Sequence, residues 1–536
     1  MTDNKNIPNI PAEKFRFVQR DKTLHDVKFN TKPRGFLSDA LYRFKKNKGS
    51  VVAAVIIAIM VLFAIIAPMV SPYTVAYQDE SFGYCYPKSR ISQALGWDFW
   101  DGGVNKEHSA ETFLLYYSMG VETGHNAVKG QKYEQEGAGN FKYRLDTYQK
   151  AGCIFKNVTL EEYLKIQEYQ DETGIQVIYP ITEKSKRPKS EGDANNANYW
   201  FETRQNGSKT SIVYAKNADG TFSFNNIYRQ YSADPSATTE IVLDGEVKTV
   251  YRDAYLSKVF VEGETAENRL YDYARVNQTG FEVRINYYEY YICKHTYIDK
   301  DGITEPIFLF GTDANGKDLF TCLGGGARLS FILAIVVSLV NMIVGALYGA
   351  VEGYYGGSAD LIMERISDIL SAVPFMIVIT LLKMHMKSSP QLLILFISFF
   401  LTGWIGMASQ TRMQFYRFKN QEYVLAARTL GARDVRIMFK HIFPNALGTL
   451  VTGQVLVIPA MIFSESSLSY LGIINLSTGN LTSVGTLLAA ADPYLSSYPY
   501  MMVFPAVFIS LLMLSFNLFG NGLRDAFNPS LRGSED

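Results

Sequence analysis

The sequence has little of three features that often reveal a protein's chemistry: net charge, cysteine and histidine. Its 52 lysines and arginines balance 52 aspartates and glutamates, so its charge gives no sign of a nucleic-acid partner. It has 4 cysteines and 6 histidines in 536 residues, and none of them form a cluster with metal-ligand spacing. The pair Cys293 and His295 is too weak a signal for a zinc site, so we expect no metal.

A complete nucleotide-binding motif is also missing. The stretch Gly311–Asp318, GTDANGKD, resembles a phosphate-binding loop, but Asp318 stands where that loop needs Ser or Thr beside magnesium. A carboxylate at that place would repel the phosphates, so we expect a tight turn at Asn315-Gly316 that leads into a membrane helix. Because no ATP-hydrolysing motif occurs elsewhere, we expect no catalytic residue and no cofactor bound by this chain, which is then not an enzyme.

Long apolar runs are what the sequence does have. Charge is dense in residues 1–48 and 75–305 but sparse in 50–72 and in most of 326–520. The run from Ser50 to Val70 carries no charge, and about 20 such residues cross about 30 Å of hydrocarbon. Five more runs follow, at about 329–350, 361–382, 392–410, 447–469 and 500–519. We therefore predict an all-α polytopic membrane protein with six transmembrane helices.

Lysine and arginine set the expected orientation, because they concentrate on the cytoplasmic side of membrane proteins. They crowd the residues just before the first span and the loop 412–441, whereas the loop 470–499 has none. We expect both termini and the basic loop to be cytoplasmic. Lys383 and Lys387 then fall outside, against the trend. No cleavable signal peptide is expected, because the first apolar run begins only after Lys48.

The expected domains follow from these boundaries. They are a cytoplasmic tail 1–49, a first span 50–72, an insert 73–305, a core 306–523 with the other five spans and a basic loop 412–445, and a cytoplasmic tail 524–536. By this topology the insert is extracytoplasmic.

The insert reads as an α+β domain. Thr159 and Glu162 have the spacing of a capping box at the start of a helix. Asp219-Gly220 and Asp244-Gly245 each separate two β-prone runs, the usual signal for a hairpin. Cys85 and Cys293 lie near its two ends, so a disulfide could close the domain, but Cys153 makes the number of cysteines odd and the pairing stays open.

Several segments resemble ABC importer permeases of the oligopeptide/dipeptide class, specifically the C-type subunit. FGTDANGKDLFTCLGGGARLSF, at 310–331, is similar to the segment before that family's second span, with Lys317 in place of arginine. GYYGG at 353–357, RISDILSAVPF at 365–375 and SESSLSYLGI at 464–473 are similar to later segments. The resemblance implies a type I ABC permease fold in a bacterial plasma membrane.

The basic loop resembles the EAA loop through which such permeases contact their ATPases. In EYVLAARTLGARDVRIMFKHIFPNAL, at 422–447, Leu425 departs from the general pattern in a way common in the peptide class. We expect a short helix over 422–430, a bend at Gly431 and a second helix over 432–442 that stops near Pro444. By resemblance the coupling residues are Glu422, Ala426, Ala427, Arg428, Gly431 and Pro444.

Charged residues within apolar spans are costly in lipid and usually face a cavity or a partner. Asp313, Asp368 and Glu465 are candidates for the translocation path or gate. Glu364 and Asp368 are four residues apart and share a helix face, and they could instead lock helix packing. For Glu465 the two interpretations stay equally open.

The resemblance implies a permease that imports oligopeptides or dipeptides with energy from ATP and magnesium bound by separate subunits. Its expected partners are a homologous second permease, two ATPases, an extracytoplasmic peptide-binding protein and membrane lipid. The same architecture could import nickel complexes or other small solutes. A secondary transporter, or a membrane-tethered sensor that acts through its outer domain, is the alternative of a different class.

Overall fold

The computed structural model describes residues 36–527 with gaps. The largest gap is 180–273, within which only residues 197–198 and four short strands are described, and the smaller gaps are 110–111, 114–115, 118–122, 137–139, 278–279, 478 and 480. Most of the two predicted tails, residues 1–35 and 528–536, lie outside the described residues.

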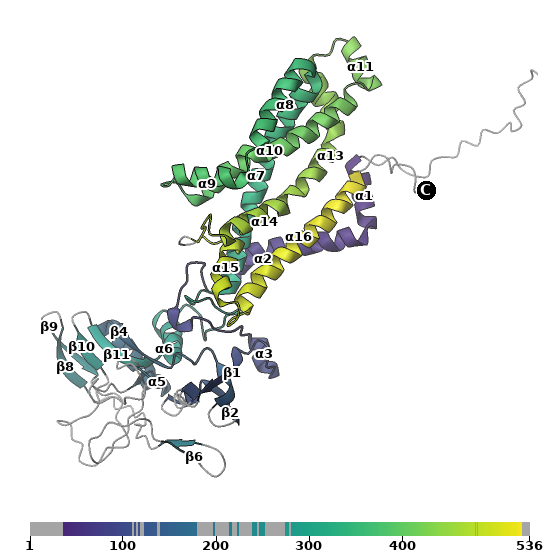
Figure 1. Ribbon diagram of the computed structural model, residues 1–536. Coiled ribbons are helices and arrows are strands. Elements are labelled where there is room, and N and C mark those ends of the chain that lie inside the picture. Colours follow the sequence, from purple (N-terminus) through teal and green to yellow (C-terminus); the bar gives the residue numbers. More distant parts are fainter. Residues whose placement is uncertain are drawn as a thin grey trace, which may run out of the picture.

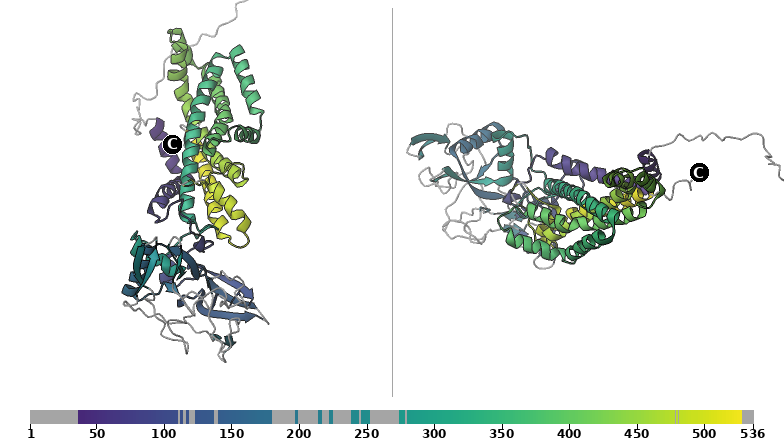
Figure 2. Two further views of the ribbon diagram at one scale, coloured as in Figure 1. Left: turned by 90° about the vertical axis from the view of Figure 1, so that its left-hand side faces the viewer. Right: turned by 90° about the horizontal axis from the view of Figure 1, so that it is seen from above.

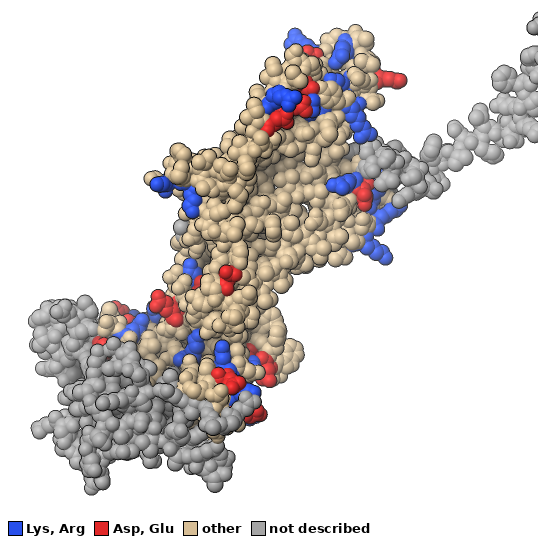
Figure 3. All heavy atoms as spheres, viewed as in Figure 1, with Lys and Arg blue, Asp and Glu red and all other residues tan. Residues whose placement is uncertain are grey.

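Among the described residues, five helical stretches are long and apolar enough to cross a membrane. They are α2 (Lys48–Val70), α7 (Leu319–Tyr355), α10 (Gln391–Phe418), the stretch Asp434–Tyr470 and α16 (Tyr500–Phe527). They form an elongated bundle with the insert at one end (Figures 1 and 2). Between its two ends the visible surface is almost free of charge (Figure 3), as a surface that faces lipid requires. The prediction of a helical membrane protein with an α+β insert is confirmed.

The predicted third span is broken in two. Its halves, α8 (Gly357–Ser371) and α9 (Phe375–His385), meet at 73°. Pro374 forms the break, because proline has no N–H for the helix ladder and disfavours helical geometry in the residue before it. Lys383, near the end of α9, donates to the carbonyl of Ile473, which explains why a lysine is tolerated there.

The fifth span enters the bundle as one bent helical stretch. It consists of α12 (Asp434–Arg436), the π-helical turn η6 (Ile437–Ile442), α13 (Phe443–Val455) and α14 (Val457–Tyr470). The prediction that helix 432–442 stops near Pro444 is wrong, because Pro444 lies in the first turn of α13. Proline is tolerated in that position, where its missing N–H costs little.

Shorter helices complete the helical part. α1 (Phe36–Lys46) packs against α16, and α15 (Val484–Ala491) packs against α14 and α16 and is followed by the 3-10 turn η7 (Asp492–Tyr494). The main apolar core joins α2, α7, α14, α15 and α16 near the end that carries the insert.

The described part of the insert contains two larger antiparallel sheets and two separate two-stranded hairpins. The first has the order β1 (Gly103–Ser109), β3 (Asn140–Asp146), β2 (Val128–Glu136). The second has the order β10 (Ala274–Asn277), β11 (Gly280–Asn286), β4 (Cys153–Val158), and β5 (Ile178–Tyr179) also pairs with β11. Helical segments η2 (Glu80–Phe82), α3 (Arg90–Leu95), α5 (Leu160–Thr173), α6 (Tyr287–Cys293) and the π-helical turn η5 (Lys294–Ile298) connect or flank these sheets.

Both predicted hairpins are confirmed by their strands. β6 (Tyr214–Lys216) pairs with β7 (Phe222–Phe224), and β8 (Thr238–Leu243) pairs with β9 (Glu246–Tyr251), while the turn residues themselves lie outside the described part. Thr159 caps α5 as expected by accepting the N–H of Glu162. The Glu162 carboxylate accepts a hydrogen bond from Tyr290 of α6, so it ties two helices together.

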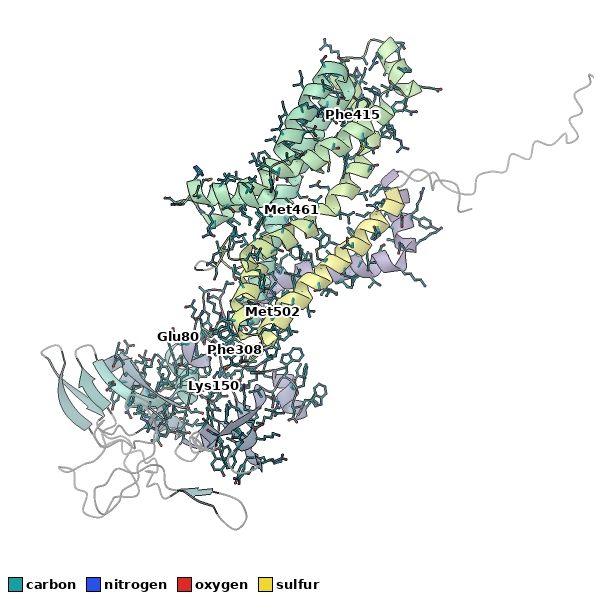
Figure 4. All side chains as sticks on the ribbon, in the orientation of Figure 1. Glu80, Lys150, Phe308, Phe415, Met461 and Met502 are labelled. Atoms are coloured by element: carbon teal, nitrogen blue, oxygen red, sulfur yellow. The ribbon has the colours of Figure 1, made fainter. Side chains whose placement is uncertain are left out.

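The core of the insert is an aromatic cluster that includes residues near both ends of the insert. Tyr73, Phe82, Tyr148, Tyr291 and Phe308 are all buried in it, and Phe308 marks its place in Figure 4. Cys85 and Cys293 belong to the same cluster as free buried thiols, so the structure does not contain the disulfide considered from the sequence.

Candidate functional site

The predicted coupling helix forms, as α11 (Glu422–Thr429). It lies at the end of the bundle opposite the insert (Figure 1). Within α11 only Val424 is fully buried. Glu422, Ala426 and Arg428 are exposed and Ala427 is half-buried, while Leu430, just past the helix, is 87% exposed. This helix and the residue after it therefore present small side chains and several large apolar ones, of which Leu430 is the most exposed and Tyr423 and Leu425 are less so.

Gly431 ends the helix in the manner expected. Its φ of +79° lies in the left-handed region, which glycine adopts at little cost. An added Cβ would meet nothing within 4 Å, so the conformation and not a lack of space requires glycine. Its N–H donates to the carbonyl of Arg428, which closes the turn.

Two residues that sequence reasoning missed fix α11 to the bundle. Tyr354, from the GYYGG segment, donates to Asp434 at 2.6 Å, and the Arg428 guanidinium lies 5.6 Å from the centre of the Tyr354 ring. Val424 packs into a cluster with Phe415, which Figure 4 labels, and with side chains from η6. The resemblance of GYYGG to a family segment was a signal, but it gave no partner for the tyrosine.

A charged cluster at the same end joins α7, α8 and α10. Arg412 contacts Asp360 through Nε at 2.6 Å and Nη2 at 2.9 Å, and it contacts Glu364 through Nη1 at 2.8 Å. Glu352 of α7, which is 3% exposed, lies 3.5 Å from the same guanidinium. We call Arg412, Glu352, Asp360 and Glu364 the arginine clamp. Planar bidentate contacts of this kind suit arginine and not lysine.

Asp368 does not join this clamp. It pairs with Arg365 at 3.2 Å, and its side chain is 56% exposed. Glu364 thus holds helices together, whereas Asp368 lies open on α8. From the sequence we expected Glu364 and Asp368 to share a helix face. That expectation did not reveal that Arg412, 48 residues after Glu364, pairs with Glu364.

At the insert end, the GTDANGKD segment forms the predicted turn. Asp313 accepts the N–H groups of Asn315 at 2.9 Å and Lys317 at 2.8 Å, and Asp318 caps α7. Asp313 is 8% exposed, and burial raises the pKa of its carboxyl group. Its geometry is that of a turn-forming residue.

The turn also interlocks with the chain that leaves the first span. Asp79 donates its N–H to the carbonyl of Asn315. A Cβ on Gly316 would lie 1.7 Å from the backbone carbonyl oxygen of Asp79. Thr312 accepts the N–H of Cys85 and donates to the carbonyl of Phe82. Residues 79–85 and 312–316 therefore form one block.

Glu465, in α14, is buried with 1% of its surface exposed. Its two oxygens accept hydrogen bonds from Ser330 of α7 at 2.8 Å and from Ser469 at 3.0 Å. Buried carboxylates need such partners. The arrangement ties α14 to α7 within this chain.

A second contact between insert and helices consists of stacked aromatic rings and lysines. The rings of Tyr84 and Tyr498 stack with centroids 4.3 Å apart. Lys150 lies 5.5 Å from the Tyr84 ring and Lys106 lies 5.5 Å from the Tyr498 ring. They line a cavity of about 460 Å³, near Lys150 and Glu80 in Figure 4. Burial lowers the pKa of Lys150.

One group of possible metal ligands occurs among the described residues: His295, Asp299 and Asp301. Both aspartates are exposed, and His295 is already engaged by Asp301 at 2.6 Å. This arrangement gives no reason to propose a metal.

Two family models match the chain. Residues 341–533 match the model described as "Binding-protein-dependent transport system inner membrane component", and residues 35–84 match "N-terminal TM domain of oligopeptide transport permease C". Neither match covers residues 85–340, which include most of the insert.

Curated relatives match about two fifths of the chain. The chain is 43% identical over 223 residues to the oligopeptide transport system permease protein OppC of Bacillus subtilis, covering 42% of this chain and 72% of the relative. It is 41% identical over 224 residues to the dipeptide permease DppC of the same organism, covering 42% and 69%. For OppC of Escherichia coli K12 the identity is 36% over 223 residues, with coverage of 42% and 72%.

Among solved structures, the inward-facing MetNI methionine ABC transporter is 15% identical with a TM-score of 0.32, covering 39% of this chain and 96% of that chain. The family models and the curated relatives agree on a multi-pass permease of the inner membrane that acts in transport and not as an enzyme. This chain belongs to the OppC/DppC family of oligopeptide and dipeptide ABC transporter permeases.

Proposed function

We propose that this chain forms one half of the pathway of an ATP-driven peptide importer and receives the ATPase movement through α11. The second half is a homologous permease, and an extracytoplasmic protein delivers the peptide. In this proposal the termini and α11 face the cytoplasm and the insert faces outside. We propose the domain boundaries that the sequence predicts, with the insert at 73–305 between the first span and the core at 306–523.

The observation that carries the coupling proposal is the contrast between the two sides of α11. One side is fixed through Val424 and through the contact of Arg428 with Tyr354, which in turn bonds to Asp434 beyond the helix. The other exposes Ala426, Leu430 and the Gly431 bend. A large exposed leucine beside small side chains fits insertion into an apolar groove of an ATPase subunit. In this proposal the surface is bordered by Glu422, Ala427, Arg428 and Pro444. Pro444 lies at the start of the fifth span, which would move.

Transmission requires that α11 move with the membrane helices. The arginine clamp joins the ends of α7, α8 and α10, and η6 continues into the fifth span. A push on α11 would then reorient these helices as a unit, as in rigid-body switching. We still propose that the translocation path or its gate includes Asp313, Asp368 and Glu465. Of these, Asp313 and Glu465 would act by holding the outer ends of helices.

Two variants on the same stretch test the coupling. Leu430→Asp should leave the chain folded but remove most of the ATPase subunits from the purified complex, because it puts a charge into an apolar groove. Val424→Ala should instead lower thermal stability by about 2 kcal/mol through loss of buried packing. The measurement is ATPase content after purification through a tag on this chain, together with the melting temperature.

Leu471→Asp is the matched control, since Leu471 is also an exposed leucine, 61% exposed, but lies beyond α14 at the insert end. Normal ATPase content in the Leu430→Asp complex would refute the coupling proposal. Mass spectrometry of cargo bound to the intact complex separates peptides from nickel complexes or other small solutes.

A further inference from the structure

The loop around α3 exposes a group of large apolar side chains on an otherwise polar domain. Ile91 is 70% exposed, Leu95 56%, Trp97 58% and Phe99 66%. We call these four residues the α3 patch. Scattered exposed apolar residues are ordinary, but a contiguous group that includes aromatic rings marks an interaction surface.

The α3 helix does not bury its large apolar side chains. Ile91 and Leu95 are one turn apart and both are exposed, whereas Ser92 is 5% exposed; Arg90 and Gln93 are exposed as well. A helix on a water-facing surface usually buries its apolar residues. The exposure of Ile91 and Leu95 therefore favours apolar surroundings on their side of α3.

The loop holds this arrangement rigidly. Ser89 donates its N–H to the carbonyl of Trp100, and Trp97 donates to that of Ser92. Gly96 ends α3 with a φ of +65°, and Arg144 donates to the carbonyl of Asp98 at 2.5 Å. The side chains are therefore presented in a fixed orientation before any partner arrives.

The α3 patch is continuous with the membrane-spanning surface. Trp100, next to Phe99, stacks on Phe504 near the start of α16, with centroids 6.2 Å apart and planes at 17°. Phe504 stacks in turn on Phe310 at 4.2 Å, and Phe310 lies 6.4 Å from Phe63 of α2. Figure 1 shows α3 on the side of the insert next to the near end of α16. This chain of rings places the patch at the level where α16 enters the bilayer.

A charged residue lies at the edge of the patch. Arg90, the first residue of α3, is exposed, donates to Thr304 at 2.8 Å and lies 3.7 Å from the Glu305 carboxylate. Tryptophan and phenylalanine favour the boundary between headgroups and acyl chains, and arginine favours the phosphates beside it.

We propose that the α3 patch lies in the headgroup–acyl boundary of the leaflet on the insert side and anchors the insert to the bilayer. The occupant of the surface is lipid, because the patch continues the lipid-facing surface of α16 through the Trp100–Phe504 stack. The anchor would fix the tilt of the insert beside the mouth of the permease. This holds whatever the cargo is.

The test is photo-crosslinking in native membranes with the full complex. Benzoylphenylalanine replaces Leu95, and a matched variant carries it at Ile175, an exposed apolar residue beyond α5. After irradiation, mass spectrometry of this chain should find phospholipid adducts at position 95 and none at 175. Crosslinks from position 95 to a protein partner instead of lipid would overturn the proposal, and so would equal lipid adducts at both positions.

A second measurement does not depend on the bulky probe. Leu95→Cys in membranes should react with a water-soluble maleimide at least tenfold more slowly than Ile175→Cys, since lipid shields the first site. The native cysteines are all buried and give little background. Equal rates at the two sites would overturn the proposal. Neither measurement reads peptide uptake, so their failure is distinct from failure of the proposed function.

Discussion

The two ends of this permease are held together by different kinds of interaction. At the insert end, many contacts involve main-chain groups: Gly316 lies against the backbone of Asp79, and the Thr312 hydroxyl bonds to two main-chain groups of the segment after the first span. At the α11 end, side chains carry the contacts, through the arginine clamp and the Val424 cluster. Backbone interlocks leave little room for adjustment, whereas side-chain contacts can loosen or shift.

This difference suggests a division of labour. The insert end is a fixed block that joins the first span, the start of α7 and the start of α16, where Tyr500 donates to the carbonyl of Thr312 at 2.8 Å. The α11 end keeps much of its surface exposed, as a surface that receives partners must. The proposed anchor of the α3 patch would add to the rigidity of the first end alone.

The largest expected effect comes from breaking the interlock with Gly316→Ala. The added Cβ would lie 1.7 Å from a backbone oxygen, which cannot move aside as a flexible side chain can. The positive φ of +72° adds strain. We expect a loss of more than about 3 kcal/mol, seen as little folded chain in membranes and a low melting temperature of what remains.

Gly302→Ala is the control for that variant, because Gly302 has a φ of +85° but nothing within 4 Å of an added Cβ. It carries the backbone strain without the collision and should cost about 1–2 kcal/mol. Equal losses in the two variants would mean that the interlock contributes nothing beyond conformation.

An intermediate effect is expected at the other end from Arg412→Met. The change leaves Glu352 buried without its cation, and removing one partner of a buried pair costs about 3–5 kcal/mol. Because Glu364 is 42% exposed and keeps access to water, we expect about 2 kcal/mol. Thermal unfolding of the purified complex measures the loss. Arg417→Met, at an exposed arginine on the same helix, should change stability by no more than about 0.5 kcal/mol. Equal melting temperatures of the two variants would mean that the arginine clamp does not stabilise the complex.

Much of the fold was predictable from the sequence because it depends on local patterns. Uncharged runs gave the spans, and Asn315-Gly316 gave the turn before α7. The interactions between distant residues were not predictable: Arg412 pairs with Asp360 across 52 positions, and Ser330 bonds to Glu465 across 135. Pro374 was visible in the sequence, but apolar residues on both sides of it suggested an unbroken span.

In the candidate site around α11, too, the local features were predictable from the sequence and the contacts between distant residues were not. The bend at Gly431 and the short helix before it follow from glycine's freedom and from local helix signals, and both were predicted. Val424 and Tyr354 could not be recognised as anchors, since a valine and a tyrosine beside a basic loop have no distinctive pattern. Their role depends on which side of α11 meets η6, and only tertiary packing decides that.

The smallest expected effect is in cysteine labelling, which shows whether the insert end is closed to solvent. Cys85, at the insert end, is fully buried and donates its thiol to the carbonyl of Thr147 at 3.3 Å. Burial raises the pKa of Cys85 from 9.0 to about 12. The reactive thiolate is then about a thousandfold rarer at pH 8 than in an ordinary cysteine, so raising the pH from 7 to 9 should give almost no maleimide labelling in the intact complex.

Cys293, whose pKa burial also raises to about 12, should behave in the same way, and the intact mass should show no disulfide. Leu430→Cys supplies the matched thiol at the other end, where the 87% exposed side chain should react quickly once ATPase subunits are stripped away. Rapid labelling of Cys85, or a bond between Cys85 and Cys293, would mean that the insert end opens in the membrane. The contrast between a closed block and an exposed docking surface would then have to be abandoned.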